Sequence, residues 1–374
     1  MIPQLSAGSL RVGRAFGIPI YVHFSWIVIF GLITWTLAAG YFPAHYPDLA
    51  TASYWAQGLV ASLLFFVSIL LHELGHSVVA LRAGIGIRSI TLFIFGGLAQ
   101  LEKEPEDGAA ELRIAIAGPL VSFALAAGFH LVAAVEGLAP AAAAVARYLA
   151  LINLVLAVFN LVPAFPLDGG RILRAALWSH LGKSRATRIA SRAGSLFAFF
   201  LIFLGVFGLL AGAGIAAIWQ ILLGWFLKEA SHGAYRGTLL EEQLDGLAVR
   251  DAMVGDVATL PAEIALDEAV REHFLRSGFG GYPVVRGARP VGLLCLRDVG
   301  RVPPEERART TAQAAMTPLG EALVIAPDEP LFDALLRLPA AGGRLLVMDG
   351  ERLVGLLPQT AVLRLLRARE ALAS

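Results

Sequence analysis

Long apolar stretches separated by short polar loops run through the first 230 residues of the chain. Each stretch approaches the roughly 18 or more residues that a transmembrane helix needs. The six stretches cover residues 18–40, 57–81, 111–135, 143–163, 194–212 and 213–229. The last two are short and rich in glycine where they meet. This pattern predicts a polytopic α-helical membrane region of about six transmembrane helices.

Residues 85–99, IGIRSITLFIFGGLA, follow a different pattern. The side chains of this segment alternate in character along the chain, many of them are β-branched, and Gly96-Gly97 provides a bend. This pattern favours a short strand or β-hairpin over a membrane span. An exposed strand edge can bind an extended peptide as an additional strand. The alternative is a connecting loop on the membrane surface.

Charge divides the chain into two parts. Residues 1–230 hold 24 Asp, Glu, Lys and Arg, whereas residues 231–374 hold 35. A membrane region followed by a soluble region explains this difference. Cys295 is the one cysteine, which excludes disulfides and cysteine metal clusters and fits a reducing cytoplasm. No basic cluster with interleaved aromatic residues suggests a nucleic-acid partner, so we expect none.

Basic residues indicate how the membrane region is oriented. They gather in loops on one side of the predicted membrane: Arg11, Arg14, Arg82, Arg88, Lys103, Arg171, Arg174, Lys183, Arg185, Arg188 and Arg192. The other side has little beyond Arg147. The positive-inside rule therefore places residues 1–17, 82–110, 166–193 and 230–374, and with them both termini, in the cytoplasm.

The second apolar stretch contains the sequence HELGH at residues 72–76. On a helix, His72 and His76 are one turn apart on the same face, so both imidazoles can bind one zinc ion. Glu73 lies on an adjoining part of the helix surface, where a carboxylate can act as a general base toward a water on the metal. Ionisable groups in an apolar span are costly unless they serve a functional cavity.

A zinc site of this kind needs at least one more protein ligand. Asp168 follows the fourth apolar stretch in the sequence NLVPAFPLDGGR. Pro163 and Pro166 interrupt the helix there, and Gly169-Gly170 allows a sharp turn. The carboxylate can thus return toward the histidines at a similar depth. Taken alone, Asp168 could equally cap a helix that begins near Arg171.

Together these segments resemble the site-2 protease family of intramembrane zinc metalloproteases. The resemblance rests on HELGH, on FGGLAQLEKEPEDGAAELRIAIAGPL and on NLVPAFPLDGGRILRA, and covers about residues 10–230. It implies that His72, His76 and Asp168 bind one zinc ion and that Glu73 is the catalytic glutamate. It also implies that the strand or hairpin at residues 85–99 binds the substrate chain.

The resemblance carries an expectation about activity and location. A protein of this kind is a zinc metalloendopeptidase in the lipid bilayer of a prokaryotic cell (plasma or inner) membrane. It hydrolyses peptide bonds of membrane-spanning substrate proteins near the cytoplasmic face, in regulated intramembrane proteolysis. We expect single-pass membrane proteins as its substrates.

Two further polar residues lie near the expected depth of the metal. Asn160 stands one turn before Pro163 and could stabilise an oxyanion or hold the substrate backbone. It could equally hydrogen-bond a neighbouring helix. His23 lies in the first apolar stretch, where a polar residue packed between helices is the simpler interpretation.

The soluble region contains an internal duplication. After a linker at residues 231–246, the first copy covers residues 247–303 and the second covers residues 310–368. Each copy has a methionine near its start, an amphipathic helix, and two strands joined by a tight turn. The pair resembles a tandem of cystathionine-β-synthase-type (CBS) domains, which implies a soluble α/β fold.

Many CBS pairs bind adenine nucleotides, so the resemblance implies ATP or a related nucleotide as a regulatory ligand. The first copy keeps the expected ribose-binding aspartate as Asp298 but has Cys295 in place of a hydroxyl residue. The second copy has Pro358 and Ala361 at the matching positions. At most one nucleotide site is therefore expected. The alternative is a purely structural pair that joins copies of the chain into a homo-oligomer.

A function of another class is a CBS-regulated metal-ion transporter, with His72, Glu73, His76 and Asp168 lining the ion path. Such a path needs further ionisable groups across the membrane. The stretch between Phe197 and Leu227 contains none, so the sequence favours the protease. A catalytically inactive scaffold would be expected to have lost Glu73 or a metal ligand.

Overall fold

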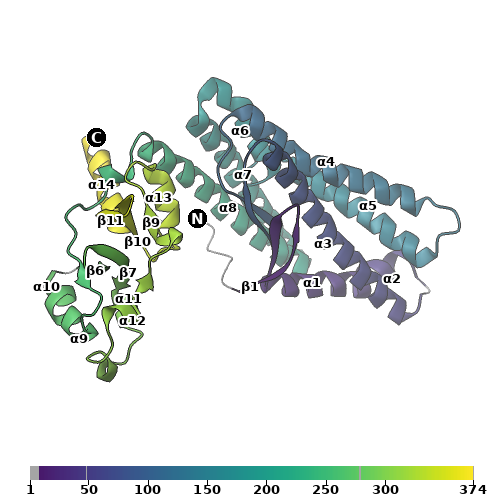
Figure 1. The fold of residues 1–374 in the computed structure, drawn as a ribbon. Coiled ribbons are helices and arrows are strands. Elements are labelled where there is room, and N and C mark those ends of the chain that lie inside the picture. The colour runs from purple at the N-terminus through teal and green to yellow at the C-terminus, as the bar shows by residue number, and fades with distance from the viewer. Residues whose placement is uncertain (1–7, 48, 278, 374) are drawn as a thin grey trace. The chain divides into compact units, whose positions relative to one another are not determined.

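The computed structural model describes residues 8–47, 49–277 and 279–373. The chain forms two compact units, residues 1–238 and residues 239–374 (Figure 1). The boundary between the units falls inside helix α8, Ile215–Leu244. Residues 231–244, expected to belong to a linker, therefore continue a helix that begins in the membrane unit.

Among the described residues of the first unit, five helical segments are long and apolar enough to cross a membrane. They are Ser25–His45, α3 (Thr51–Arg82), α4 (Gly108–Ala133), α5 (Pro140–Asn160) and α7 (Lys183–Leu210). The first segment consists of α1 (Ser25–Thr36), a π-helical turn (Leu37–Tyr41) and α2 (Phe42–His45). The sixth expected span, 213–229, is the first half of α8, which is helical but is not one of these five. The chain is thus a multi-pass membrane protein.

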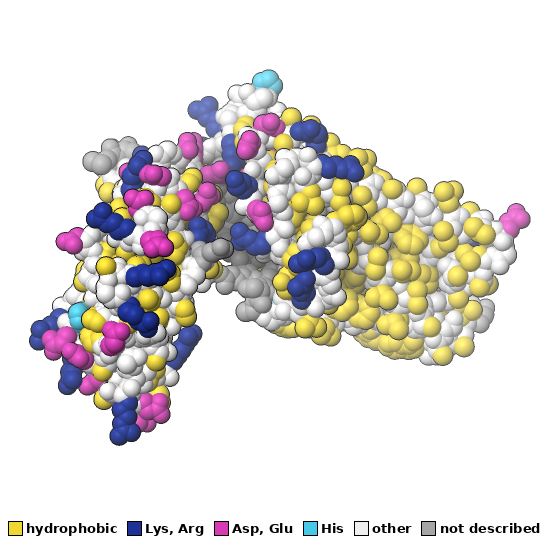
Figure 2. All heavy atoms as spheres, viewed as in Figure 1, with side chains coloured by type: hydrophobic (Ala, Val, Ile, Leu, Met, Phe, Trp, Pro, Cys, Tyr) yellow, Lys and Arg dark blue, Asp and Glu magenta, His cyan; other side chains and the backbone are white. Residues whose placement is uncertain are grey.

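The surface of the helical unit is apolar where lipid would contact it. Leu196, Phe199, Phe203 and Phe207 on α7 are all more than half exposed. Figure 2 shows hydrophobic side chains over most of the visible face of this unit, whereas charged side chains are spread over the second unit. A broad exposed apolar band is what a bilayer-embedded surface requires.

A four-stranded sheet accompanies the helices. Its strands are β1 (Ser9–Ala15), β2 (Ile18–His23), β3 (Ile87–Phe93) and β4 (Gly96–Leu101), hydrogen-bonded in that order. The hairpin expected at residues 85–99 is present as β3 and β4. Residues 18–23, expected within the first membrane span, instead form β2, which pairs in parallel with β3. Hydropathy alone did not separate this apolar strand from the helix that follows it.

A buried ion pair joins α4 to α6 (Asp168–Leu181), the helix that begins with Asp168. Glu111 on α4 and Arg174 on α6 are 2% and 5% exposed. Arg174 Nε lies 2.8 and 2.9 Å from the two carboxylate oxygens of Glu111, and its Nη2 bonds the same carboxylate. The guanidinium also lies over the rings of Phe165 and Trp178. Arg174 therefore fixes α6 against α4.

A second acidic residue extends this contact toward α7. Glu104 Oε2 lies 3.1 Å from Lys183 Nζ and 3.8 Å from Arg174 Nη1. Burial by itself would raise the pKa of Glu104, but the two cations outweigh burial and lower that pKa below its ordinary value. Glu104 is therefore ionised at neutral pH and links the middle of α6 to the start of α7.

The second unit contains two small sheets of matching design. The first is β5 (Leu260–Pro261), β6 (Gly281–Arg286), β7 (Arg289–Cys295) and β8 (Thr317–Pro318); the second is β9 (Val324–Ile325), β10 (Arg344–Asp349) and β11 (Arg352–Pro358). In each, a two-residue strand pairs in parallel with the first strand of an antiparallel hairpin.

Short helices connect and flank these strands. They are α9 (Leu266–Ala269), a π-helical turn (Val270–Phe274), α10 (Leu275–Ser277), α11 (Leu296–Val299), α12 (Ala312–Ala315), α13 (Leu331–Arg337) and α14 (Gln359–Ala373). In addition, 3-10 turns lie at Val249–Asp251, Pro304–Glu306 and Glu321–Leu323.

The two repeats exchange their leading segments. The Met316 side chain lies so close to Gly292 that a Cβ there would be 2.6 Å from its sulfur. Met253 lies over Gly355 in the same way, at 2.9 Å. Each methionine lies near the start of one repeat and packs on a glycine of the other, so the two repeats form one interlocked body.

We predict that Glu111→Met and Arg174→Met each destabilise the protein strongly, because each leaves one buried charge without its partner. The expected loss is about 3–5 kcal/mol for either single variant, with most of it recovered in the double variant. Thermal unfolding of the purified protein measures this cycle, with exposed Arg113→Met on α4 as the control. A single variant that melted with the wild type would contradict the structural role of the pair.

Candidate metal centre

Helix α3 presents two buried histidines on one face. His72 and His76 are 4% and 7% exposed, and their Nε2 atoms lie 3.2 Å apart. The helical repeat of 3.6 residues places residues four apart one above the other. The local sequence thus determines half of the site before any tertiary contact is made.

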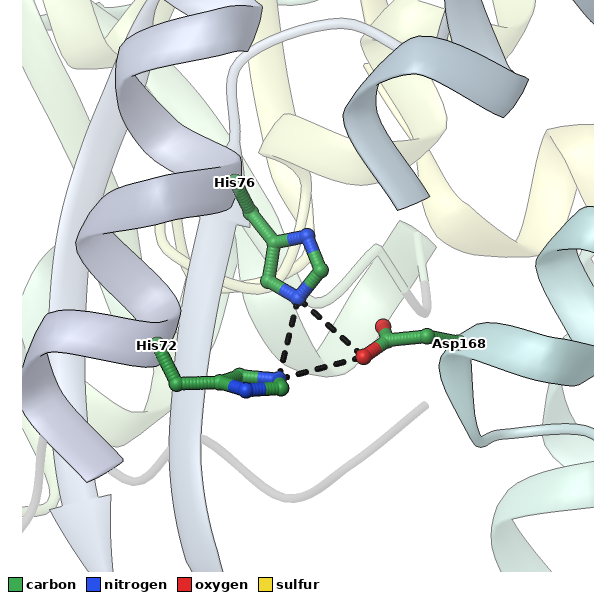
Figure 3. A group of neighbouring side chains, drawn as sticks. All are labelled: His72, His76 and Asp168. Carbon is green, nitrogen blue, oxygen red and sulfur yellow. Dashed lines mark hydrogen bonds and ion pairs between the residues drawn. The ribbon is translucent and has the colours of Figure 1, made fainter. Parts of the chain in front are cut away.

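Asp168 approaches these histidines from the first turn of α6. Its Oδ2 lies 3.1 Å from His72 Nε2 and 3.2 Å from His76 Nε2 (Figure 3). The helix begins at Asp168 itself, rather than near Arg171 as the capping alternative assumed. Its carboxylate is directed at the two imidazoles, so three ligand atoms from two distant segments meet at one place.

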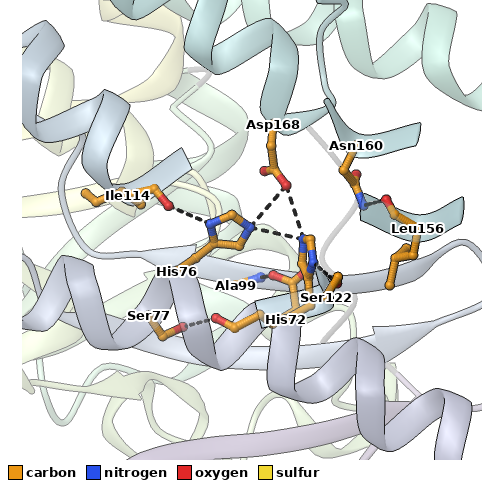
Figure 4. A network of polar contacts seen from close by, with 10 residues as sticks. His72, His76, Ser77, Ala99, Ile114, Ser122, Leu156, Asn160 and Asp168 are labelled. Carbon is orange, nitrogen blue, oxygen red and sulfur yellow. Dashed lines mark hydrogen bonds and ion pairs between the residues drawn. The ribbon is translucent and has the colours of Figure 1, made fainter. Parts of the chain in front are cut away.

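The other ring nitrogens are held by α4 (Figure 4). His76 Nδ1 lies 2.7 Å from the carbonyl oxygen of Ile114. A carbonyl only accepts, so Nδ1 carries the proton and Nε2 presents a lone pair. His72 Nδ1 lies 2.8 Å from Ser122 Oγ, which can accept the equivalent bond. Such partners orient metal-binding histidines and fix their tautomer.

These three donor atoms lie close enough together to hold one metal ion. A tetrahedral zinc ion with bonds of about 2.0–2.1 Å places its ligand atoms about 3.3 Å apart. The separations of 3.1–3.2 Å between His72, His76 and Asp168 match that spacing. Two imidazoles and one carboxylate also form a donor set typical of catalytic zinc.

Gly118 makes room for this site. A Cβ at this position of α4 would lie 2.1 Å from His76 Nε2 and 2.6 Å from His72 Nε2. Any side chain would therefore occupy the space where the donor atoms face α4. The absence of a side chain here is a requirement of the site and not of the helix.

Glu73 connects the metal helix to the sheet. Its Oε2 accepts a hydrogen bond of 3.2 Å from the backbone N–H of Ala99 in β4. A Cβ at Gly97 would lie 2.5 Å from Glu73 Cγ, so the strand approaches closely because this position is a glycine. Strand β4 is at the edge of its sheet. The carboxylate therefore stands beside a strand edge.

The remaining residues singled out from the sequence lie elsewhere. Asn160 donates its side-chain N–H to the carbonyl of Leu156 in its own helix, at 3.1 Å. His23 Nδ1 lies 2.8 Å from Ser25 Oγ at the end of β2. Neither belongs to the group of three metal donors. Asp298 is 3% exposed and its Oδ2 accepts the N–H of Cys295, so one carboxylate oxygen caps α11.

Comparison with known proteins identifies the chain. Residues 60–144 and 138–203 match peptidase family M50, and residues 249–304 match the CBS domain. Two relatives carry "zinc metalloprotease" in their names. Protein sll0528 of Synechocystis sp. is 35% identical over 373 residues, 98% of each chain. Rip3 of Mycobacterium tuberculosis is 36% identical over 365 residues, 96% of this chain and 93% of the relative.

The chain belongs to the M50, or site-2 protease, family. A solved site-2 protease from Methanocaldococcus jannaschii is 35% identical in sequence, covering 61% of this chain and 95% of that chain, with a TM-score of 0.43. This M50 protein is therefore an intramembrane zinc metalloprotease that acts on membrane proteins. Its family decides between the protease and the transporter that the sequence left as alternatives.

Sequence reasoning missed the residues that support the metal donors. These are Glu111, Ile114, Gly118, Ser122 and Arg174, all on α4 or α6. One signal was available, because a glycine inside an apolar helix often marks a close approach of another element. Ile114 contacts His76 through its backbone carbonyl, so the identity of its side chain gives no sequence signal of this contact.

We predict that Gly118→Ala abolishes zinc binding, because the added methyl group collides with both imidazoles. Gly128→Ala is the matched control: it lies in the same helix, and a Cβ there meets nothing within 4 Å. Metal content measured on the purified variants should fall well below one ion per chain for Gly118→Ala and remain near wild type for Gly128→Ala. Equal zinc content in the two variants would show that zinc binding does not need the free space at Gly118.

Proposed function

We propose that this protease hydrolyses peptide bonds within single-pass membrane proteins, near the cytoplasmic face of the membrane. The proposal rests on the convergence of His72, His76 and Asp168, with Glu73 next to the first of them on α3. These three donors would hold the zinc ion between α3 and α6. The carboxylate of Glu73 lies beside the edge of the sheet, where it accepts the N–H of Ala99.

The residues of the chain divide the chemistry between them. Zinc held by the three donors supplies a Lewis acid that polarises a carbonyl and makes water more acidic. Glu73 takes one proton from the attacking water and passes it to the nitrogen of the scissile bond as the carbon–nitrogen bond breaks. The second proton of the water stays on the new carboxyl group and is released when that group ionises, so the products are a carboxylate, an amine and one proton. The N–H of Ala99 keeps the Glu73 carboxylate in place before substrate arrives.

A substrate helix must open before it can react, because its carbonyls are hydrogen-bonded and shielded within the helix. Strand β4 offers a place for the opened segment. Its Ala99 N–H donates to Glu73, so this edge strand lies beside the catalytic carboxylate. A substrate strand added to β4 would therefore lie next to Glu73.

The distribution of basic residues supports a specific orientation. We propose that residues 1–17, 82–110, 166–193 and 230–374 are cytoplasmic and that the protein resides in a prokaryotic cell membrane. This orientation requires α8 to cross the membrane as a sixth span, and it places the first turn of α6, which carries Asp168, on the cytoplasmic side. The metal centre would then be close to the inner face of the bilayer.

We predict that Glu73→Gln lowers peptide hydrolysis at least 100-fold and leaves zinc content near wild type, because an amide cannot take the proton. Asp168→Ala should lower both, since it removes a ligand. Cleavage of a reconstituted transmembrane substrate and metal analysis measure the two effects. Glu136→Gln, on the exposed loop after α4, is the control. Full activity in Glu73→Gln would disprove the general-base role.

We predict that Ala99→Pro raises the KM for a transmembrane substrate and also lowers kcat, because proline disturbs strand pairing at the β4 edge and removes the N–H that holds the Glu73 carboxylate. The control is Val12→Pro on β1 at the opposite edge, where the register shifts between Arg11 and Gly13. Steady-state kinetics on both variants provide the comparison. If Val12→Pro raised KM as much as Ala99→Pro, the β4 edge would have no special role.

We further propose that the second unit binds an adenine nucleotide where its two repeats meet, and that binding regulates the protease. Arg344 of the second repeat lies over Gly280 and Gly281 of the first, and Arg297 of the first lies over Gly342 of the second. Two guanidinium groups beside glycine backbone are suited to phosphate. The Oδ1 atom of Asp298 remains near this place, 3.6 Å from Arg297 Nε.

Calorimetry of ATP, ADP and AMP with the full-length protein tests the nucleotide proposal. We expect binding at millimolar concentration or tighter, weakened about tenfold or more in Arg344→Gln. Asp298→Asn should also weaken it while keeping an acceptor for the Cys295 N–H. Arg289→Gln, at an exposed hairpin turn, is the control. Absence of binding by all three nucleotides would leave dimerisation or docking as the role of this unit.

A further inference from the structure

Helices α7 and α8 enclose a hollow of about 260 Å³ that the proteolytic reaction does not use. Its lining is polar: Arg188, Ser191, Arg192, Ser195, His232 and Tyr235. The four residues from α7 are spaced at three, four and seven positions, which places them on one face of the helix. This face is directed at the turn of α8 that carries the histidine and the tyrosine.

The lining is rich in hydrogen-bond donors and contains no carboxylate. Arg188 Nε donates to Tyr235 Oη at 2.9 Å, which holds the guanidinium at the hollow. Within the described part of the chain, neither Arg188 nor Arg192 forms an ion pair with an acidic residue. Two exposed arginines next to a histidine, without a balancing charge, favour an anion.

Ser191 provides an independent indication of a ligand. The residue is 4% exposed, and its hydroxyl has no hydrogen-bond partner in the described structure. Its own carbonyl oxygen already accepts bonds from Ser195 Oγ at 3.0 Å and Ser231 Oγ at 2.7 Å. A buried hydroxyl without a partner is costly unless something else bonds it. It lies in the wall of the hollow.

The surface next to the hollow indicates what kind of ligand the anionic group belongs to. Leu196, Phe199 and Phe200 follow on the same helix and are 73%, 54% and 52% exposed. They belong to the apolar part of α7 that spans the membrane. A ligand at this place would thus have an anionic group among arginines and a hydrocarbon chain along leucine and phenylalanine.

We propose that this hollow binds the phosphate group of an anionic phospholipid. Arg188 and Arg192 contact the phosphate oxygens, the hydroxyls of Ser191 and Tyr235 donate to the headgroup, and the acyl chains lie on the exposed face of α7. Arginine matches phosphate because its planar group donates two parallel hydrogen bonds. The hollow would hold α7 and α8 at a fixed depth in the bilayer.

The test uses the full-length protein in detergent, titrated with phosphatidylglycerol or phosphatidylcholine of identical acyl chains and followed by native mass spectrometry. We expect phosphatidylglycerol to bind about tenfold or more tightly than phosphatidylcholine. Arg188→Gln with Arg192→Gln should weaken phosphatidylglycerol binding roughly 30-fold, which corresponds to about 1 kcal/mol for each arginine. Arg113→Gln, an exposed arginine on α4, should leave binding unchanged.

Three outcomes would overturn the proposal. One is equal affinity for the two lipids, and another is undiminished phosphatidylglycerol binding in the double variant. The third is displacement of phosphatidylglycerol by an equal concentration of inorganic phosphate, which would make this a site for a free anion. If the double variant does not fold, the single variant Arg192→Gln replaces it, with an expected loss of about fivefold.

Discussion

The contact on which the metal centre depends is the ion pair of Glu111 and Arg174. Asp168 is the first residue of a short helix, and a single carboxylate at a helix start would move easily without support. Arg174, six residues later, is bonded through two of its nitrogens to a glutamate that is 2% exposed. Because both charges are buried, separating them is costly, and α6 is thereby held against α4.

Helix α4 has a second role in the same site. It supplies the Ile114 carbonyl and the Ser122 hydroxyl to the outer nitrogens of the two histidines. It also leaves space for their inner nitrogens at Gly118. One helix thus orients the histidines of α3 and, through Glu111, holds the aspartate of α6. No metal donor comes from α4 itself, yet the positions of all three depend on it.

The sheet brings the Glu73 carboxylate and a strand edge together. Glu73 lies on α3, the helix that also carries the two histidines. Strand β4 approaches Glu73 closely because Gly97 has no side chain. The Ala99 N–H then bonds the carboxylate. If Glu73 acts on the substrate as proposed, this arrangement gives a physical reason for a β-sheet in a membrane protease, since the strand edge lies beside that carboxylate.

The sequence by itself determined what is local in this protein. The spacing of His72, Glu73 and His76 follows from the helical repeat, and the apolar stretches indicated the membrane helices, five of which, among the described residues, are both long and apolar enough to cross. The sequence also pointed to Asp168, through its prolines and glycines and through the resemblance to site-2 proteases. Only the tertiary structure decided that residues 18–23 form a strand, that Gly118 clears the metal site, that Glu111 pairs with Arg174, and that the two repeats exchange their leading segments. Each of these depends on segments far apart in the chain, such as the 63 positions between Glu111 and Arg174. Helical periodicity specifies neighbours within one element, whereas contacts between elements are set by packing that no local pattern encodes.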